Sequence, residues 1–186
     1  MLGLFKSFSS NIHYKYSVQS HPTFQSGCWS VFDAKNKTTN DPVSVFVIEK
    51  KTVQDLLASN GIKPRSAVVA EVWEFAMKGV QQLTKIRHPA VLKLVEPLET
   101  HKNSLCFVTE RVISTIESMR ETDQHELTIV RGLSNIVQAL QFLHNQLGMV
   151  HNNMRPSSVF IDAQGDWKLM GFEFLVRFEE FSSGDY

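Results

Sequence analysis

The sequence predicts an α+β fold, because a strand-rich first part is followed by two long amphipathic helices and further short strands. In residues 1–50, aromatic and β-branched residues recur between polar turn clusters. From Ala67 to Arg87, and again from Leu127 to Gln146, apolar residues recur at steps of three or four. The expected order is five strands with a helix after the third, then a long helix and a short hairpin.

The first three strands follow from local patterns. Tyr14, Tyr16 and Val18 alternate with polar residues and predict one half-buried strand. Trp29, Val31 and Phe32 mark a second strand. The polar run 35–41 and Pro42 predict a hairpin turn, and Val43 to Glu49 is apolar enough to be a central third strand. A short helix is expected from Val53 to Ser59.

Each long helix is expected to bury one face. In the first, this face comprises Val69, Val72, Phe75, Ala76, Val80, Leu83 and Ile86, and His88-Pro89 ends the helix. In the second, it comprises Val130, Leu133, Ile136, Val137, Leu140, Leu143 and His144. Between the helices, strands are expected at 91–95 and 105–110 around a turn at 99–103. A hairpin at 159–170 follows the second helix.

Composition narrows the class of protein. The 186 residues carry 19 Lys+Arg and 19 Asp+Glu, so no net field favours nucleic acid, which is not an expected partner. No run approaches the roughly 20 apolar residues of a membrane span, so no transmembrane segment is predicted. Cys28 and Cys106 are too few for a disulfide framework and lack the paired spacing of a zinc site. Both are predicted to be reduced and buried.

Five segments resemble the protein kinase fold in order and spacing. They are VSVFVIEKK at 43–51, KGVQQLTKIRHPAVLKL at 78–94, LCFVTERV at 105–112, VHNNMRPSSVFI at 150–161 and WKLMGFEF at 167–174. The resemblance implies an N-terminal arm at 1–11, an N-lobe and hinge at 12–112, and a partial C-lobe at 113–186. The N-lobe would be a five-stranded antiparallel sheet with the αC helix. The C-lobe would be truncated, ending at the start of the activation segment.

By that resemblance, this chain lacks the side chains that carry out phosphoryl transfer. Phe46 replaces the third-strand lysine, and Gly79 the αC glutamate. Asn153 replaces the catalytic aspartate, Ser158 the metal-binding asparagine, and Gly171 the aspartate that holds Mg²⁺. No catalytic or metal-binding residue is therefore expected. Glu173 is a weak candidate for a rearranged carboxylate, and Asp162 is better explained by a hairpin turn.

Some nucleotide-binding positions are kept. The hinge residues Glu110, Arg111 and Val112 could bond a purine through their backbone, and Arg155 matches the catalytic-loop lysine that contacts phosphate. In the phosphate loop only Gly27 is retained, beside bulky aromatic residues. No cofactor is expected, with ATP bound without Mg²⁺ as the alternative.

Among kinase-like proteins, GVQQLTKIRHP and WKLMGFEF, together with Phe46 and Asn153, resemble the SCY-like pseudokinases, nearest the coated-vesicle-associated branch. The resemblance implies an inactive adaptor or scaffold in clathrin-dependent traffic between the trans-Golgi network and endosomes. It implies clathrin and adaptor coat components as partners. It also implies a cytoplasmic location, peripheral on Golgi, endosomal and coated-vesicle membranes.

Three alternatives stay open at this point. One is a weak or atypical serine/threonine kinase that uses the hinge and Arg155 for ATP. The second is an interaction protein without an open cleft, in which Trp29 and Phe46 fill the nucleotide site. The third is a non-functional fragment of a longer protein, since Tyr186 comes before the rest of a helical lobe.

Overall fold

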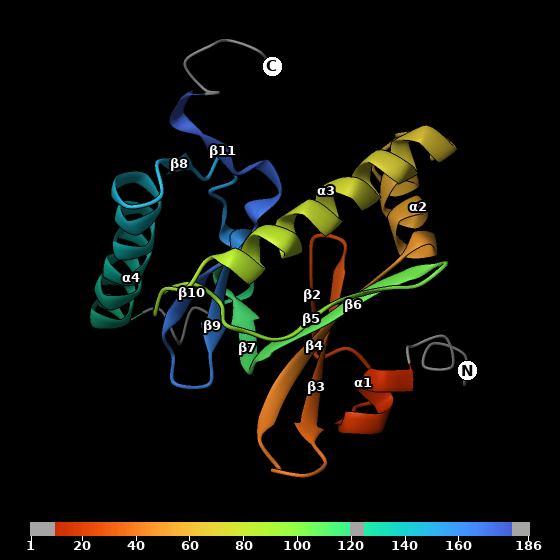
Figure 1. Ribbon diagram of the computed structural model, residues 1–186, viewed down its shortest axis with the longest axis horizontal. Coiled ribbons are helices and arrows are strands. Elements are labelled where there is room, and N and C mark those ends of the chain that lie inside the picture. Colours follow the sequence, from red (N-terminus) through yellow and green to blue (C-terminus); the bar gives the residue numbers. More distant parts are fainter. Residues whose placement is uncertain (1–9, 120–124, 180–186) are drawn as a thin grey trace. The chain divides into compact units, whose positions relative to one another are not determined.

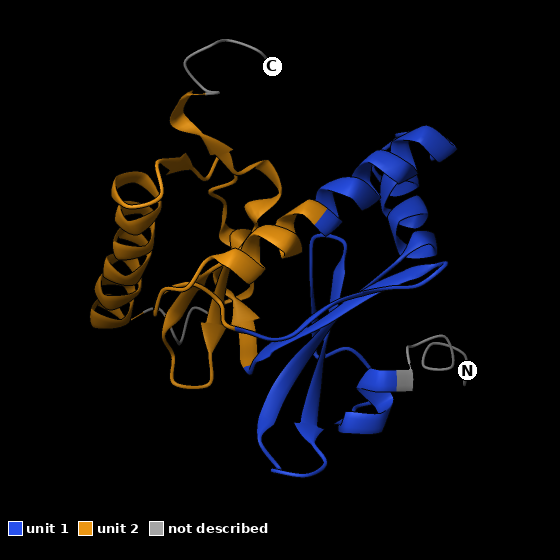
Figure 2. Ribbon diagram, in the orientation of Figure 1, with its two compact units in different colours: residues 1–77, 94–111 blue, residues 78–93, 112–186 orange. Residues whose placement is uncertain are grey.

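The computed structural model describes residues 10–119 and 125–179, and the chain divides into two compact units. Unit 1 comprises residues 1–77 and 94–111, and unit 2 comprises residues 78–93 and 112–186 (Figure 2). The boundary therefore passes through one helix and through the predicted hinge. Most of the predicted arm at 1–11 lies outside the described residues.

Unit 1 is built on an antiparallel sheet (Figure 1). Its long strands are β3 (Trp29–Asn36), β4 (Pro42–Glu49), β6 (Ser104–Glu110) and β5 (Leu94–Thr100). Two short strands, β1 (Tyr16–Val18) and β2 (Phe24–Ser26), pair with opposite halves of β3. The order is β1-β3-β4-β6-β5, so the predicted five-position sheet is confirmed, with its first position divided between two strands.

The third predicted strand is central, as expected. In β4 every residue from Val43 to Ile48 is buried, and the strand pairs with β3 on one side and β6 on the other. A strand buried on both faces reads as a continuous apolar run rather than as an alternation. This explains why VSVFVI was recognisable from the sequence.

The predicted strand through Tyr14 is wrong at its start. Residues Ser10–Lys15 form helix α1, and Tyr14 is 83% exposed. Ile12 and Tyr16 are instead both buried, in a cluster with Cys106 and Val108 on the sheet. A spacing of four suits a helical turn, and three alternating residues were too few to distinguish it from a strand.

Two helices follow β4, namely α2 (Lys50–Ser59) and α3 (Ser66–Lys85). Helix α3 crosses from unit 1 into unit 2. Its predicted face is partly wrong, because Trp73 is buried whereas Val72 and Phe75 are only half-buried. The ammonium of Lys50 lies 5.4 Å from the centre of the Trp73 ring, a cation–π contact.

The next predicted strand is displaced. It was expected at 91–95, whereas β5 begins at Leu94 and runs to Thr100, which leaves only 101–103 for the turn. Strand β5 is at the edge of the sheet, where Pro97 is tolerated, and its pairing with β6 shifts register twice. Val91, which precedes β5 and belongs to unit 2, forms an isolated parallel bridge to Leu169 of the same unit.

Unit 2 contains helix α4 (Glu126–Asn145) and two small sheets. The larger has the order β10-β9-β7, from β7 (Val112–Thr115), β9 (Val159–Asp162) and β10 (Trp167–Leu169). The smaller pairs β8 (Met149–Val150) with β11 (Val176–Arg177). Short 3-10 helices occur at Ile116–Ser118, Pro156–Ser158 and Phe172–Phe174. The hairpin at 159–170 is confirmed, and β7 was not predicted.

Helix α4 has the predicted period but a different buried face. Its buried residues are Gly132, Ile136, Ala139 and Leu143, whereas Val130, Leu133 and Val137 are 59%, 53% and 51% exposed. Leu140 is half-buried and His144 exposed. A Cβ added at Gly132 would lie 2.1 Å from Cδ2 of Trp167, so the indole packs directly on the helix backbone. The buried face of α4 includes the small residues Gly132 and Ala139, which contribute little to a hydropathy pattern.

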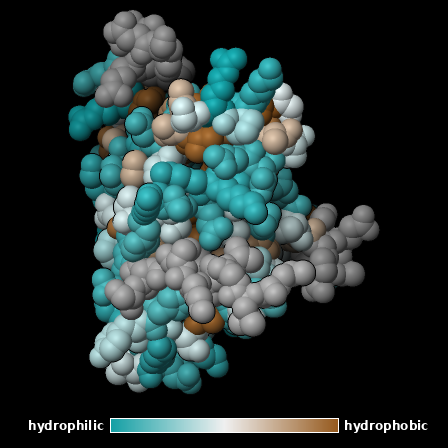
Figure 3. Space-filling view, turned by 90° about the vertical axis from the view of Figure 1, so that its right-hand side faces the viewer, coloured by the Kyte–Doolittle hydropathy of each residue, from teal (hydrophilic) through white to brown (hydrophobic). Residues whose placement is uncertain are grey.

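The surface and the cysteines complete the description. Hydrophilic residues cover most of the face in Figure 3, where hydrophobic residues form small separate patches. In the described part of the chain, no helix is long and apolar enough for a membrane span. Cys106 is buried and Cys28 half-buried, and neither is in a disulfide. Burial, reinforced by the charge of Glu99, raises the pKa of Cys106 to about 12.

Candidate functional site

In unit 1, the predicted lysine position is part of an aromatic stack. Phe46 on β4 is 0% exposed, and its ring stacks on Phe107 of β6 with centroids 4.8 Å apart and planes 16° from parallel. The edge of Trp29 meets Phe107 at 5.0 Å. Aromatic pairs in these geometries add about 0.5–1.5 kcal/mol beyond their burial. The position that would hold a cation in an active kinase is therefore part of an apolar core.

The predicted phosphate loop forms a hairpin turn between β2 and β3. Gly27 has φ 56°, in the left-handed region, and no atom lies within 4 Å of a Cβ added there. The glycine is therefore explained by the backbone conformation of the turn rather than by close approach to a ligand. Trp29, which begins β3, is buried beside this turn, and Phe24 is half-buried.

The hinge residues are partly engaged within unit 1. The Arg111 guanidinium lies 3.1 Å from a carboxylate oxygen of Asp33 on β3. The Thr109 hydroxyl donates to the Glu110 carbonyl over 2.7 Å. This carbonyl is one of the backbone groups that could otherwise accept a bond from a purine. Val112 is fully buried and begins β7 in unit 2.

In unit 2, His151 has a structural role in the catalytic-loop segment. Its Nε2–H donates to the Met170 carbonyl at 2.9 Å, and its Nδ1 accepts from the Asn153 backbone N–H at 3.2 Å. Its ring lies 5.2 Å from that of Phe172. Burial lowers the pKa of His151 to about 4, so the imidazole is neutral at pH 7. The histidine therefore packs the catalytic-loop segment against the segment that contains Gly171.

Asn153, which replaces the catalytic aspartate, ties two segments together. Its side-chain amide donates to the Gly171 carbonyl and to Oε2 of Glu173, both over 3.0 Å. The Ser158 hydroxyl donates to the Asn153 carbonyl over 2.8 Å. An amide cannot take up a proton at neutral pH, and here its two N–H groups are both occupied. We call Asn153, Ser158, Gly171 and Glu173 the amide–carboxylate cluster.

Gly171, which replaces the Mg²⁺-binding aspartate, fits only without a side chain. Its φ is 85°, and a Cβ added there would lie 2.7 Å from the Ser158 hydroxyl oxygen and 3.0 Å from Nδ2 of Asn153. An aspartate at this position would require both neighbours to move. The substitutions at 153, 158 and 171 are thus mutually consistent in space.

Glu173 fills the space beside the αC position. A Cβ added at Gly79 would lie 3.0 Å from both Cγ and Cδ of Glu173. Gly79 therefore faces the metal turn, as the alignment requires, and its missing side chain leaves room for the glutamate. Burial raises the pKa of Glu173, which the bond from Asn153 and the charge of Arg155 only partly offset.

The alternative carboxylates do not form a metal site in unit 2. Asp162 accepts backbone N–H bonds from Gln164 and Asp166, both at 2.9 Å, and lies 3.4 Å from the Lys168 ammonium. This is the predicted hairpin turn. Among the described residues, the group of His, Cys, Asp and Glu side chains close enough to hold a metal lies in unit 1. Arg155 is exposed and precedes the 3-10 helix at 156–158.

Comparisons with known proteins agree with the fold. The protein kinase domain family model matches residues 27–183. This chain belongs to that family. It is 36% identical over 203 residues to the protein kinase domain-containing protein ppk32 of Schizosaccharomyces pombe, with 97% of this chain and 27% of that protein covered. It is 35% identical over 196 residues to the protein kinase-like protein SCY1 of Saccharomyces cerevisiae, with 94% and 24% covered.

The relatives also assign the chain to the SCY1-like pseudokinases. A further match, 29% identical over 147 residues, is the probable inactive serine/threonine-protein kinase scy1 of Dictyostelium discoideum, with 79% of this chain and 16% of that protein covered. The kinase-like domain of this chain is accordingly a pseudokinase. The chain spans about a quarter of the length of the two yeast relatives.

A solved structure has the same fold. The crystal structure of Cex1p superimposes with a TM-score of 0.71 at 23% identity, covering 97% of this chain and 31% of that one. The sequence had missed the contact of Glu173 with Gly79 and Asn153. The available signal was the presence of a glutamate two residues after the lost metal ligand, together with a glycine in the middle of a helix.

Proposed function

We propose that this chain is a non-catalytic binding domain of a scaffold or adaptor that acts in clathrin-dependent traffic between the trans-Golgi network and endosomes. The amide–carboxylate cluster is the observation that carries the non-catalytic part. Three groups that would handle a proton and Mg²⁺ in a kinase are replaced by groups that bond one another. Since positioning and electrostatics supply most of the acceleration in phosphoryl transfer, little of that machinery is left.

The traffic role rests on the resemblance to the coated-vesicle-associated branch of SCY-like proteins. By that resemblance, the partners are clathrin and adaptor coat components, and the protein is cytoplasmic and peripheral on Golgi, endosomal and coated-vesicle membranes. The relatives are about four times as long as this chain, so their further segments would share in these contacts. The domain itself would supply a folded surface rather than a reaction.

Nucleotide binding is tested by thermal unfolding of the chain with ATP, alone and with Mg²⁺ or Mn²⁺. We expect no metal-dependent rise in melting temperature, because Gly171 stands where a kinase has the aspartate that binds Mg²⁺. In parallel, transfer of labelled phosphate to a generic substrate is measured for the native chain and for Arg155→Ala. Metal-dependent stabilisation with transfer that Arg155→Ala abolishes would establish the atypical kinase instead.

The traffic role is tested separately. The tagged chain, and a longer protein that contains it, are expressed in cells and followed through purification of clathrin-coated vesicles. Co-purification of the longer protein with clathrin, lost when vesicles are stripped of their coat, is the expected result. Its absence from coated vesicles would contradict the traffic assignment while leaving the pseudokinase assignment intact.

A further inference from the structure

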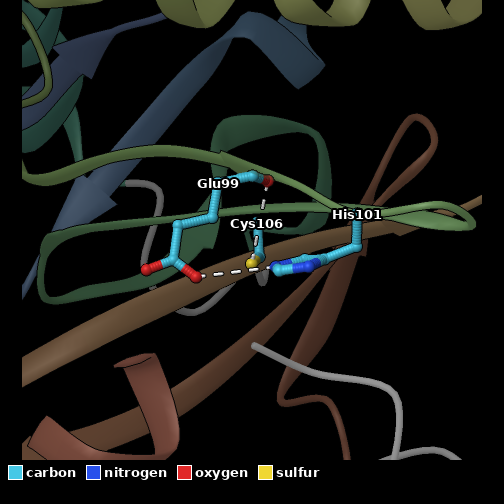
Figure 4. Close-up of side chains that lie close together, drawn as sticks. All are labelled: Glu99, His101 and Cys106. Carbon is cyan, nitrogen blue, oxygen red and sulfur yellow. Dashed lines mark hydrogen bonds and ion pairs between the residues drawn. The ribbon is translucent and has the colours of Figure 1, made fainter. Parts of the chain in front are cut away.

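Three side chains that bind metals in other proteins converge on the β5–β6 hairpin of unit 1. They are Glu99 on β5, His101 in the turn and Cys106 on β6 (Figure 4). One ligand atom from each lies within 4.8 Å of the other two. Oε2 of Glu99 and Nε2 of His101 are 3.5 Å apart, and the Cys106 sulfur lies 4.0 Å from the Glu99 carbonyl oxygen.

The register of the hairpin explains this convergence. Glu99 and Cys106 are directly opposed across the two strands, so their side chains emerge on the same face of the sheet. His101 follows Glu99 by two residues, and the period of an extended chain returns it to that face. The turn is fixed by His101 N–H donating to the Ser104 carbonyl at 2.8 Å and by Lys50 N–H donating to Asn103 at 3.0 Å. The three ligands are therefore presented by one constrained segment.

Two of the ligand atoms are buried without a hydrogen bond. Oε2 of Glu99 and Nε2 of His101 are shielded from solvent, and the 3.5 Å contact between them is an ion pair only when the imidazole is protonated. A buried polar atom without a hydrogen bond costs about 1–3 kcal/mol, so native structures rarely leave one unexplained. Here two such atoms face each other and a thiol. An ion between them would satisfy all three groups.

We propose that Glu99, His101 and Cys106 bind one Zn²⁺ ion. Sulfur, imidazole nitrogen and carboxylate oxygen are the ligand types that zinc accepts together, whereas Mg²⁺ and Ca²⁺ take oxygen ligands. Zinc bonds of about 2.0–2.3 Å in a tetrahedron place ligand atoms roughly 3.3–3.8 Å apart. The three ligand atoms all lie within 4.8 Å of one another, so movements of about 1 Å would bring them to this spacing. Three protein ligands leave a fourth position for water or another donor.

The proposed site differs from the expectation drawn from cysteine spacing alone. A zinc site was not expected because Cys28 and Cys106 lack a paired motif, yet the other two ligands come from histidine and glutamate on the same hairpin. The site is on the sheet of unit 1 and none of its residues belongs to the amide–carboxylate cluster. It is therefore independent of the proposed function.

The test is a Co²⁺ titration of the reduced 186-residue chain, followed by displacement with Zn²⁺. A thiolate–Co²⁺ charge-transfer band that saturates at about one equivalent and disappears on adding Zn²⁺ is expected. Cys106→Ser should abolish this band, and Cys28→Ser, the matched control, should retain it. Absence of a saturable band from the native chain, or a band that depends on Cys28 instead, overturns the proposal.

A second pair of variants guards against loss of folding in Cys106→Ser, whose side chain is fully buried. His101→Gln and Glu99→Gln alter half-buried side chains, and each should weaken Co²⁺ binding at least about tenfold. Their melting temperatures are measured with and without Zn²⁺. Zn²⁺ should raise the melting temperature of the native chain and not that of His101→Gln. Equal stabilisation of both would show that the bound metal does not use this site.

Discussion

The aromatic stack of unit 1 and the amide–carboxylate cluster of unit 2 have lost phosphoryl-transfer groups in opposite ways. Around Phe46 the lost cation is replaced by rings that exclude polar groups. Around Asn153 the lost carboxylates and the lost metal-binding amide are replaced by an amide, a hydroxyl, a glycine and a displaced carboxylate, all in contact. One region became apolar, and the other became a close-packed polar network.

The difference predicts how each region responds to change. An apolar stack depends on volume and burial and contains no group that titrates, so its stability should be indifferent to pH. A polar network depends on protonation state and on fixed donor positions, so both pH and small steric changes should disturb it. Substitutions in the two units can separate these behaviours.

The largest effect is expected from Phe46→Ala. Removing a fully buried phenyl ring from a stack should lower the free energy of unfolding by about 3–5 kcal/mol. Urea unfolding followed by tryptophan fluorescence measures this, and the loss should be the same at pH 5 and pH 8. Tyr14→Ala, at a side chain that is 83% exposed, is the control and should change stability by less than about 0.5 kcal/mol. A loss below 1 kcal/mol at Phe46 would contradict the packing argument.

The next effect is the pH response of unit 2 through His151. Its pKa is about 4 when folded and near 6.5 when unfolded, so the unfolded chain binds the proton first as pH falls. This contribution is complete above pH 6.5 and is lost between pH 6.5 and 4, amounting to about 3 kcal/mol. His151→Gln should flatten the stability profile over that range.

The matched control for His151 is His21→Gln, at an exposed histidine of unit 1. It should leave the profile of the native chain unchanged. If both variants keep the same slope between pH 6.5 and 4, the buried neutral imidazole is not the source of the acid sensitivity.

A smaller effect isolates the steric fit at Gly171. Gly171 and Gly165 have φ of 85° and 82°, so an alanine at either site meets the same backbone penalty of about 1–2 kcal/mol. Only at Gly171 does the new Cβ also meet Ser158 and Asn153, since no atom lies within 4 Å at Gly165. Gly171→Ala should therefore be about 1–3 kcal/mol less stable than Gly165→Ala in urea unfolding. Equal losses of stability in the two variants would mean that Ser158 and Asn153 move aside at little cost.

The smallest effect concerns Glu173. Because burial raises its pKa when folded, the folded chain holds this proton more tightly, and stability should fall as pH rises from about 4.5 through the raised value. Glu173→Gln removes that titration and keeps an oxygen that accepts from Asn153. The variant should become the more stable chain at pH 8, by chemical unfolding, whereas the exposed Glu179→Gln should not. A native chain that gains stability over this range through Glu173 would reverse the assignment.

The sequence predicted elements with strong periodicity and the motif order, and it predicted less well how faces and replacements fit together. Strand β4 and helix α4 were recognisable because long apolar patterns outweigh local exceptions. The phase of α4 was wrong because its buried face includes Gly132, on which Trp167 packs, and Ala139, and such small residues contribute little to a hydropathy pattern. Short elements such as α1 and β7 carry too few residues for a pattern.

The candidate site was also predictable only in part. The lost groups at 46, 79, 153, 158 and 171 could be identified by alignment, because each is a single residue in a motif. What replaced them could not be identified, since Glu173 and Gly79 meet only through folding. The Glu99, His101 and Cys106 cluster was missed for the same reason, because its spacing has meaning only in the register of a hairpin.

The contact between Gly79 and Glu173 also constrains how the lost groups could be restored. A reversion that restored an acid at position 79 would place a second carboxylate against Glu173 in space that is already filled. A reversion at 171 would meet Ser158 and Asn153. Each kinase residue would therefore meet a neighbour that occupies its space in this structure. Restoring one lost group alone would not rebuild the site, because the neighbouring side chain would also have to change.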